Sequence, residues 1–102
     1  FGKVLFYSPK DKSGFWIDKT VAEIINNNEI IRNGYKTEAF NSVGVVNWDE
    51  NGTEYCEKRD EYKERAKTTE LAGYYNFATS LREISSNFEF HAERMKDTYN
   101  DI

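Results

Sequence analysis

Cys56 and His91 are the two side chains whose types could supply a nucleophile and a general base. Each is the single residue of its kind in the chain, and the sequence indicates no third group that would orient the base. Glu89 and Glu93 stand on either side of His91, but the helix of a zinc protease carries two histidines at that spacing. The sequence therefore predicts a small strand residue at Cys56, a solvated side chain at His91 and no enzymatic activity.

The stretch "NWDENGTEYCEK" resembles the loop of a calcium site in its first half. Asn47, Asp49, Asn51 and Gly52 occupy the first, third, fifth and sixth positions of that pattern. The last position, which needs a bidentate glutamate, is Lys58. One cysteine also excludes an internal disulfide, and one histidine alone holds no metal. We therefore expect no metal and no cofactor, and we interpret the stretch as a hairpin turn.

The composition predicts one globular domain over residues 1–102, with a β-rich half over 1–57 and a helical half over 58–102. Charge is divided unevenly: residues 1–48 carry six Lys and Arg against five Asp and Glu, while residues 49–102 carry eight against thirteen. A duplex-binding protein concentrates positive charge, and this chain does not. No apolar run approaches the roughly 20 residues of a membrane span, so we expect no membrane association and a cytoplasmic location.

Two strands and a short helix are predicted at the start of the chain. The runs "KVLFYS" and "FWI", the latter at Phe15 to Ile17, are rich in β-formers and flank the turn residues "PKDKSG". Thr20 and Glu23 then have the spacing of a capping box, which predicts a helix start. Asparagine tolerates the left-handed backbone that ends helices, so the run Asn26 to Asn28 predicts its end. The expected buried stripe of this helix is Val21, Ile24 and Ile25.

Further strands are predicted up to residue 58. Asn33 and Gly34 form a strong turn dipeptide between two short strand-like pieces of "EIIRNGYKTEAF". The segments "SVGVVNW" and "TEYCEK" are separated by "DENG", which predicts a second hairpin.

A long helix is predicted in the last third of the chain, after a charged stretch at residues 58–70 that reads as a solvated helix or a connector. Positions that alternate by three and four residues carry apolar or aromatic side chains with one exception, Ser85. Such a seam is typical of a helix that lies along another helix or across a sheet. The seam consists of Leu71, Tyr74, Ala78, Leu81, Ser85, Phe88, Ala92, Met95, Tyr99 and Ile102.

These elements together predict an α+β fold: a small antiparallel sheet of two hairpins with a short helix, packed against a long C-terminal helix. Tyr75, Phe77, Ile84 and Phe90 fall outside the seam, so the apolar face is wider than a coiled coil requires. In a small domain a surplus of this kind marks a partner site or a dimer interface.

Residues 2–57 resemble a cold-shock domain, a small barrel of the OB type, in two segments. "GKVLFYSPKDKSGFWI" is similar to that family's first two strands, and "NGYKTEAFNSVGVVNWDENGTEYCEK" to its closing segment. The family's second glycine before the returning phenylalanine and its Val-Phe-Val-His strand are not present. The resemblance implies binding of single-stranded RNA or DNA by base stacking on exposed aromatic rings. The alternative is an aromatic hairpin whose rings pack under the C-terminal helix.

Two functions are therefore expected from the sequence. The acidic helical half, the wide aromatic stripe and the scarcity of catalytic groups favour a non-enzymatic protein-interaction module, a regulator or inhibitor of another protein such as a phage or mobile element encodes. We expect it to be a homodimer, with a partner-binding or dimer seam at Leu81, Phe88, Met95 and Tyr99. The alternative is single-stranded nucleic-acid binding, for which the candidate residues are Phe6, Phe15, Trp16, Lys10, Lys12 and Lys19.

Overall fold

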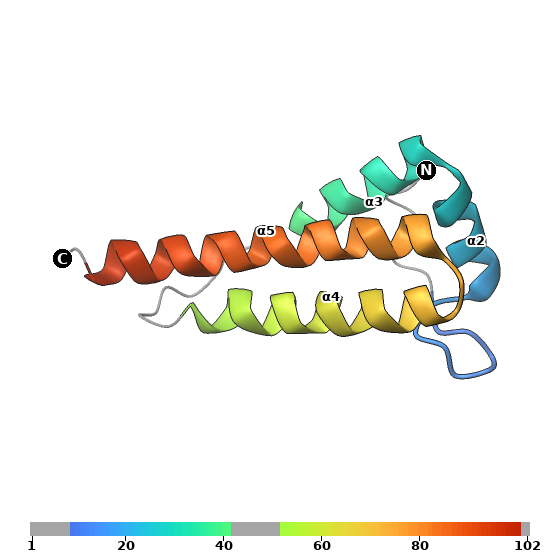
Figure 1. Cartoon of the computed structure of the whole chain (residues 1–102), viewed down its shortest axis with the longest axis horizontal. Coiled ribbons are helices and arrows are strands. Elements are labelled where there is room, and N and C mark those ends of the chain that lie inside the picture. Colours follow the sequence, from blue (N-terminus) through green and yellow to red (C-terminus); the bar gives the residue numbers. More distant parts are fainter. Residues whose placement is uncertain (1–8, 42–51, 101–102) are drawn as a thin grey trace.

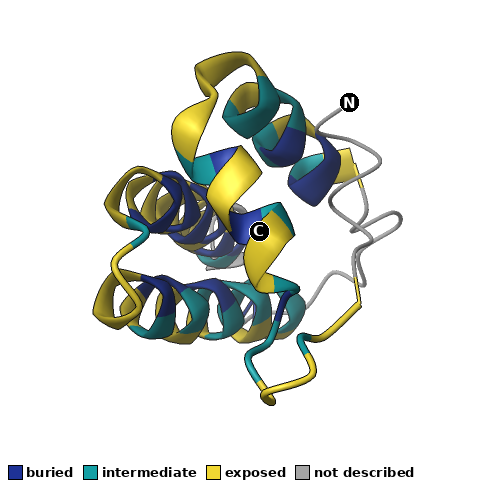
Figure 2. Ribbon diagram, turned by 90° about the vertical axis from the view of Figure 1, so that its right-hand side faces the viewer, coloured by how far each residue is buried: buried dark blue, intermediate teal, exposed yellow. Residues whose placement is uncertain are grey.

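The computed structural model describes residues 9–41 and 52–100, and within these ranges the regular structure is helical. The helices are α2 (Lys19–Asn27), α3 (Glu29–Asn41), α4 (Thr53–Leu71) and α5 (Tyr75–Asn100). Helices α4 and α5 run antiparallel as a long hairpin (Figure 1). Helices α2 and α3 pack on one side of that hairpin, and its opposite side is left uncovered by them (Figure 2).

The predicted α+β fold is wrong, because residues 9–41 and 52–100 contain no strand. Residues 15–17 form a loop, residues 29–41 form α3, and residues 53–58 begin α4. The strands predicted at residues 3–8 and 42–48 lie outside the described residues. In the described part of residues 2–57, the barrel that the cold-shock resemblance implies is therefore replaced by helices and a loop.

Helix α3 shows why the strand prediction failed there. Ile31, Tyr35 and Ala39 are four residues apart and form its inward stripe, with Tyr35 and Ala39 buried. Gly34 lies inside the helix and has no positive φ, although a glycine there costs about 1 kcal/mol of helix stability. Burial of the neighbouring tyrosine offsets that cost, so tertiary packing overrides the turn dipeptide.

The short helix predicted near residue 20 is confirmed as α2, but its cap is not the predicted one. The side chain of Asp18 accepts hydrogen bonds from the backbone N–H groups of Thr20 and Val21, at 2.9 and 3.2 Å. Thr20 therefore lies inside the first turn. Ala22 and Ile25 are the buried residues of α2, whereas Ile24 of the expected stripe is 37% exposed.

The asparagine run ends α2 at the predicted place, but Asn28 has an extended backbone, with φ of −136°, and not the left-handed one expected. The run also begins α3. The side chain of Asn28 accepts a hydrogen bond from the N–H of Ile31 at 3.1 Å, as a helix cap does. Arg32 donates to the carbonyl of Asn26 at 2.6 Å, which satisfies one of the free carbonyls at the end of α2. The corner between the two helices is thus held by side chains that reach the backbone.

The charged stretch at residues 58–70 belongs to α4, a separate helix that a tight turn joins to α5. Gly73 has φ of +95°, a backbone conformation that favours glycine, and its N–H donates to the carbonyl of Glu70. Leu71 and Tyr74, the first two residues of the predicted seam, therefore lie at this turn and not within α5. The seam itself is confirmed from Ala78 to Met95, because every member between them is buried against neighbouring elements.

The core is built around α5, which contacts each of the other three helices. Phe77, Leu81, Ile84 and Phe88 of α5 are fully or almost fully buried. The ring of Phe77 meets Tyr35 of α3 edge-on with 5.2 Å between centroids. At the other end of α4, a Cβ atom on Gly52 would come 3.0 Å from the carbonyl oxygen of Ala92, so glycine permits this close approach.

Replacing Asp18 with alanine should destabilise the protein by about 1 kcal/mol, because two N–H groups at the start of α2 lose their acceptor. Thr20→Ala is the matched control: its side chain is exposed and makes no cap, so the change should stay within about 0.5 kcal/mol. Urea unfolding followed by circular dichroism measures both. A larger loss for Thr20→Ala than for Asp18→Ala would contradict the observed cap.

Candidate functional site

The expected dimer seam is part of the core of the single chain. Leu81, Phe88 and Met95 have exposed fractions of 0%, 2% and 2%. The ring of Phe88 packs on Tyr62 and Tyr55 of α4 and on Phe40 of α3, with centroids 5.6 to 6.2 Å apart. These side chains are buried within the single chain, so a partner would have to contact other residues. The fourth residue of the seam, Tyr99, has a side chain outside the described part of the structure.

The aromatic residues expected to bind nucleobases are anchored against the helical hairpin. The indole N–H of Trp16 donates to the buried hydroxyl of Thr69 in α4 at 3.0 Å. Its ring lies 5.7 Å from that of Phe77, and the ring of Phe15 lies 6.4 Å from that of Tyr74. Both side chains are half-buried. The alternative interpretation was an aromatic hairpin whose rings pack under the C-terminal helix; the packing of the rings agrees with this arrangement, but residues 15–17 form a loop and not a strand.

The guanidinium group of Arg65 covers the outer side of this aromatic cluster. It lies 4.8 Å from the centroid of the Trp16 ring and 5.4 Å from that of Tyr62, in the range of cation–π contacts. Arg65 also forms an ion pair with Glu61, one turn earlier in α4, at 2.7 Å. The indole is thus in contact on several sides.

The three lysine candidates are exposed. Lys10 and Lys12 lie in the loop, whereas Lys19 begins α2, where its charge contributes to lowering the pKa of the Asp11 carboxyl. Phe6, the remaining candidate for nucleic-acid binding, lies outside the described residues. Asp11 stabilises the loop by accepting from the hydroxyl and N–H of Ser13 and from the N–H of Lys19, and these hydrogen bonds lower the pKa of its carboxyl to about 2.

Large apolar side chains are exposed at one end of the molecule, where the corner between α2 and α3 meets the turn between α4 and α5. Asn26 links the two, since its side chain accepts from the N–H of Phe77 at 3.0 Å. We call this surface the apolar end, and Figure 2 looks directly at it, with exposed residues on α2 and on both connections. Its large exposed side chains are Ile24, Ile30, Leu71 and Tyr75.

Of the apolar end, the sequence pattern indicates Tyr75 as a surplus apolar residue but misses Ile30 and Leu71, because it assigns them to other elements. Ile30 was expected in a strand and Leu71 in the helical seam, yet they are 82% and 81% exposed. A helical interpretation of residues 29–41 would have placed Ile30 beside the stripe of Ile31, Tyr35 and Ala39 and not in it. Phe90 is also exposed, but it lies on α5 away from this end, beneath the guanidinium of Arg94.

Cys56 and His91, the two residues considered as nucleophile and base, lie on α4 and α5. Cys56 is half-buried in α4, and the exposed ring of His91 stacks on Tyr55 with 5.4 Å between centroids. Among residues 9–41 and 52–100, no three His, Cys, Asp or Glu side chains converge as a metal site would require. None of the helices in these ranges has both the length and the apolar character of a membrane span.

Replacing Trp16 with phenylalanine should cost about 1 to 2 kcal/mol of stability, because the buried hydroxyl of Thr69 loses its donor. Trp16→Ala should cost roughly 3 kcal/mol, since the ring contacts with Phe77 and Arg65 are lost as well. Phe90→Ala is the control and should change stability by less than about 0.5 kcal/mol, because that ring is exposed. Urea unfolding is the measurement. A fully stable Trp16→Ala variant would show that the ring is not anchored.

The protein should lose stability as the pH rises from 10 towards 12. Burial raises the pKa of Tyr62 from its ordinary value of 10.0 to about 12, and burial also raises the pKa of Tyr35. The folded chain therefore keeps a proton that the unfolded chain releases in this window, at a cost of roughly 2 kcal/mol for Tyr62.

Thermal unfolding at a series of pH values tests this expectation. Tyr62→Phe should reduce the alkaline loss, whereas Tyr75→Phe, at an exposed position, should leave it unchanged. Ionisation of all tyrosines at an ordinary pKa, seen by their ultraviolet absorbance in the folded protein, would contradict it.

Comparison of the chain with known proteins gives no match: no family model, no curated protein and no solved structure is significantly similar to it.

Proposed function

We propose that the protein is a non-enzymatic protein-interaction module that regulates or inhibits another protein in the cytoplasm. The observation that carries the proposal is the apolar end. Ile30 and Leu71 are more than four-fifths exposed, Tyr75 is 64% exposed, and Ile24 lies at the same end. Isolated exposed apolar residues are ordinary, but four large ones on helices that meet at one end of a small chain favour a partner that covers them.

The expected energetics support a protein partner. Covering apolar surface contributes about 25 cal/mol per Å² that is removed from water. The leucine, isoleucine and tyrosine side chains that offer such surface here lie on α2 and at the ends of α3, α4 and α5 that border the two short connections. Ala72 and Gly73 beside Leu71 are exposed and small, so a partner could approach the turn closely. A second copy of this chain is one such partner, and it would place the dimer interface at the apolar end and not at the buried seam.

Single-stranded nucleic-acid binding is the second candidate. It is favoured by the exposed Lys10 and Lys12 on the loop that carries the half-buried rings of Phe15 and Trp16, and by the exposed Lys19 at the start of α2. It ranks lower because the Trp16 ring already contacts Phe77 and Arg65. A nucleobase would have to displace these contacts or stack on the outer edge of Phe15.

Photo-crosslinking in the cells that express the protein tests the proposed function. Benzoylphenylalanine is introduced in place of Tyr75 at the apolar end, and separately in place of Phe90. Phe90 is the matched control, because both are exposed aromatic residues of α5 but only Tyr75 lies at the apolar end. We expect a discrete product from position 75, either of doubled mass or with one other protein, and none from position 90. Leu71→Glu should reduce that product about tenfold through lost apolar contact.

Two outcomes would overturn the proposal. Equal products from positions 75 and 90 would show that the apolar end is not special. The absence of any product, together with a monomeric mass at all concentrations in light scattering, would show that this surface has no protein partner.

A further inference from the structure

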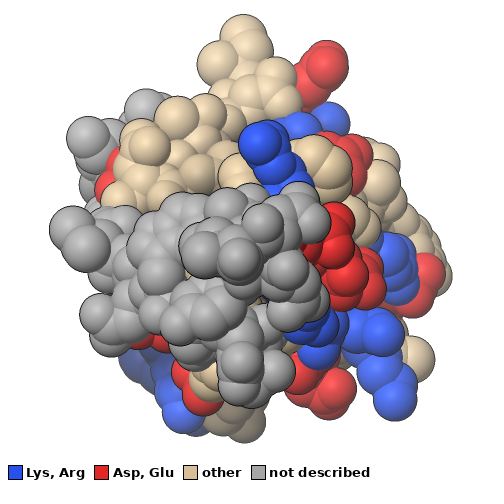
Figure 3. Space-filling view, turned by 90° about the vertical axis from the view of Figure 1, so that its left-hand side faces the viewer, with Lys and Arg blue, Asp and Glu red and all other residues tan. Residues whose placement is uncertain are grey.

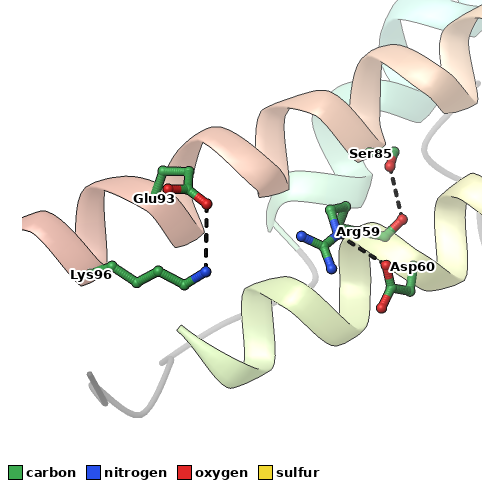
Figure 4. Close-up of polar contacts among 5 residues, drawn as sticks. All are labelled: Arg59, Asp60, Ser85, Glu93 and Lys96. Atoms are coloured by element: carbon green, nitrogen blue, oxygen red, sulfur yellow. Dashed lines mark hydrogen bonds and ion pairs between the residues drawn. The ribbon is translucent and has the colours of Figure 1, made fainter. Parts of the chain in front are cut away.

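A second surface, formed by the uncovered side of the α4–α5 hairpin, has a chemistry different from that of the apolar end. A groove of about 940 Å³ runs between the two helices and is lined by residues of these helices alone. Figure 4 shows part of it, with Arg59 and Asp60 of α4 facing Ser85 of α5 and α3 behind them. We call it the charged groove, and its lining residues are Arg59, Asp60, Lys63, Glu64, Lys67, Arg82, Ser85, Ser86 and Glu89.

Short side chains make the groove hollow. Ser85 occupies a seam position between the large residues Leu81 and Phe88, and Ser86 follows it. The hydroxyl of Ser85 donates to the carbonyl of Arg59 at 2.8 Å, so this small polar residue is satisfied without filling the space above it. The two helices are therefore linked by a hydrogen bond at Ser85, while the groove between them stays open to solvent.

The cations of the groove are not equally engaged. Arg59 forms an ion pair with Asp60 at 2.9 Å, and Arg82 forms one with Glu70. Lys63 and Lys67 are the two cations on the described parts of α4 and α5 that have no ion pair, hydrogen bond or ring contact. Every other Lys or Arg there has one, namely Lys58, Arg59, Arg65, Arg82, Arg94 and Lys96.

The spacing of these lysines suits a second helix. Lys63 and Lys67 are one turn apart on α4, which corresponds to a rise of about 6 Å. Carboxylates four residues apart on a partner helix have the same rise and could face both lysines. Two helices that lie side by side also leave a groove into which a third helix packs, as in helical bundles.

The acidic residues of the groove select against nucleic acid. Asp60, Glu64 and Glu89 line it beside the lysines, so a continuous row of phosphates would meet carboxylates as well as lysines. A peptide helix of mixed charge can instead place a basic side chain near Glu64 or Glu89. Figure 3, which views the opposite end of the molecule, likewise shows blue and red side chains interspersed on the described surface, with no extended basic patch.

We infer that the charged groove binds an acidic helical segment of a partner protein, with carboxylates four residues apart on Lys63 and Lys67. This inference rests on the proposed protein-interaction function and adds a second surface with a defined partner chemistry. The apolar end would bury apolar area, and the charged groove would determine which partner is accepted and in which register.

The test uses a synthetic alanine-rich helical peptide with glutamates at four-residue spacing and a single lysine, added at low salt to the full ¹⁵N-labelled chain. We expect the amide signals of Lys63, Lys67, Ser85 and Ser86 to shift. Lys63→Glu with Lys67→Glu should weaken binding about tenfold or more. The matched control is Lys10→Glu with Lys12→Glu, which makes the same change of charge on exposed loop lysines outside the groove and should leave the affinity within about twofold.

Two further probes define the ligand. The same peptide with glutamine in place of glutamate should not bind, and oligothymidylate should bind more weakly than the acidic peptide. Equal weakening by the groove and loop variants, shifts that map outside the groove, or no binding of the acidic peptide would overturn the inference. Tighter binding of oligothymidylate would overturn it in favour of nucleic acid.

Failure of this inference is distinguishable from failure of the proposed function. Leu71→Glu should leave peptide binding unchanged, because Leu71 does not line the charged groove. Loss of the crosslink at position 75 with intact peptide binding would remove only the role of the apolar end. An intact crosslink without peptide binding would remove only the role of the groove.

Discussion

Helix α5 contributes side chains to every packed layer of the described structure, and its apolar stripe is the constraint on which the other helices depend. Phe77, Leu81, Ile84 and Phe88 are buried between α4 on one side and α2 with α3 on the other. Burying side chains of this size contributes about 1.5 to 3 kcal/mol each. Helix α4 has a weakly amphipathic, highly charged sequence, so its position depends on contacts such as Tyr62 with Phe88 more than on its own pattern.

Polar contacts at one end then fix how the N-terminal helices sit on the hairpin. The side chain of Asn26 accepts from the N–H of Phe77 at the first turn of α5, and the indole of Trp16 donates to Thr69 near the end of α4. These are directional bonds, and two of the four groups belong to fully buried residues, so a shift of α2 or of the loop would leave them unsatisfied. The same end presents the apolar side chains that we assign to a partner. Rigid support beneath a binding surface reduces the ordering cost of association.

The two proposed surfaces differ in the physical quantity that they offer. The apolar end offers area to remove from water, whereas the charged groove offers two lysines without an ion pair beside three carboxylates. Burial of apolar area contributes affinity but selects weakly among partners. Complementary charges select among partners but contribute less affinity. The proposed regulator would use both to recognise one partner, and the described helices hold the two surfaces on different parts of the α4–α5 hairpin.

The sequence by itself determined the elements with strong local signals: the short helix ended by asparagines, the helical region from residue 58, and the apolar seam from Ala78 to Met95. The spacing of apolar residues was sufficient to predict the seam, because a helix buries the side chains that lie along one of its faces. The strands assigned to residues 29–41 and 53–58 were wrong, since β-branched residues, an Asn-Gly pair and adjacent aromatics describe local preference, which burial of Tyr35 and Tyr62 overrides. Tertiary structure alone decided which apolar residues stay outside. Leu81 and Leu71 have the same chemistry, but one is fully buried on α5 and the other ends α4 in solvent, and no local pattern separates them.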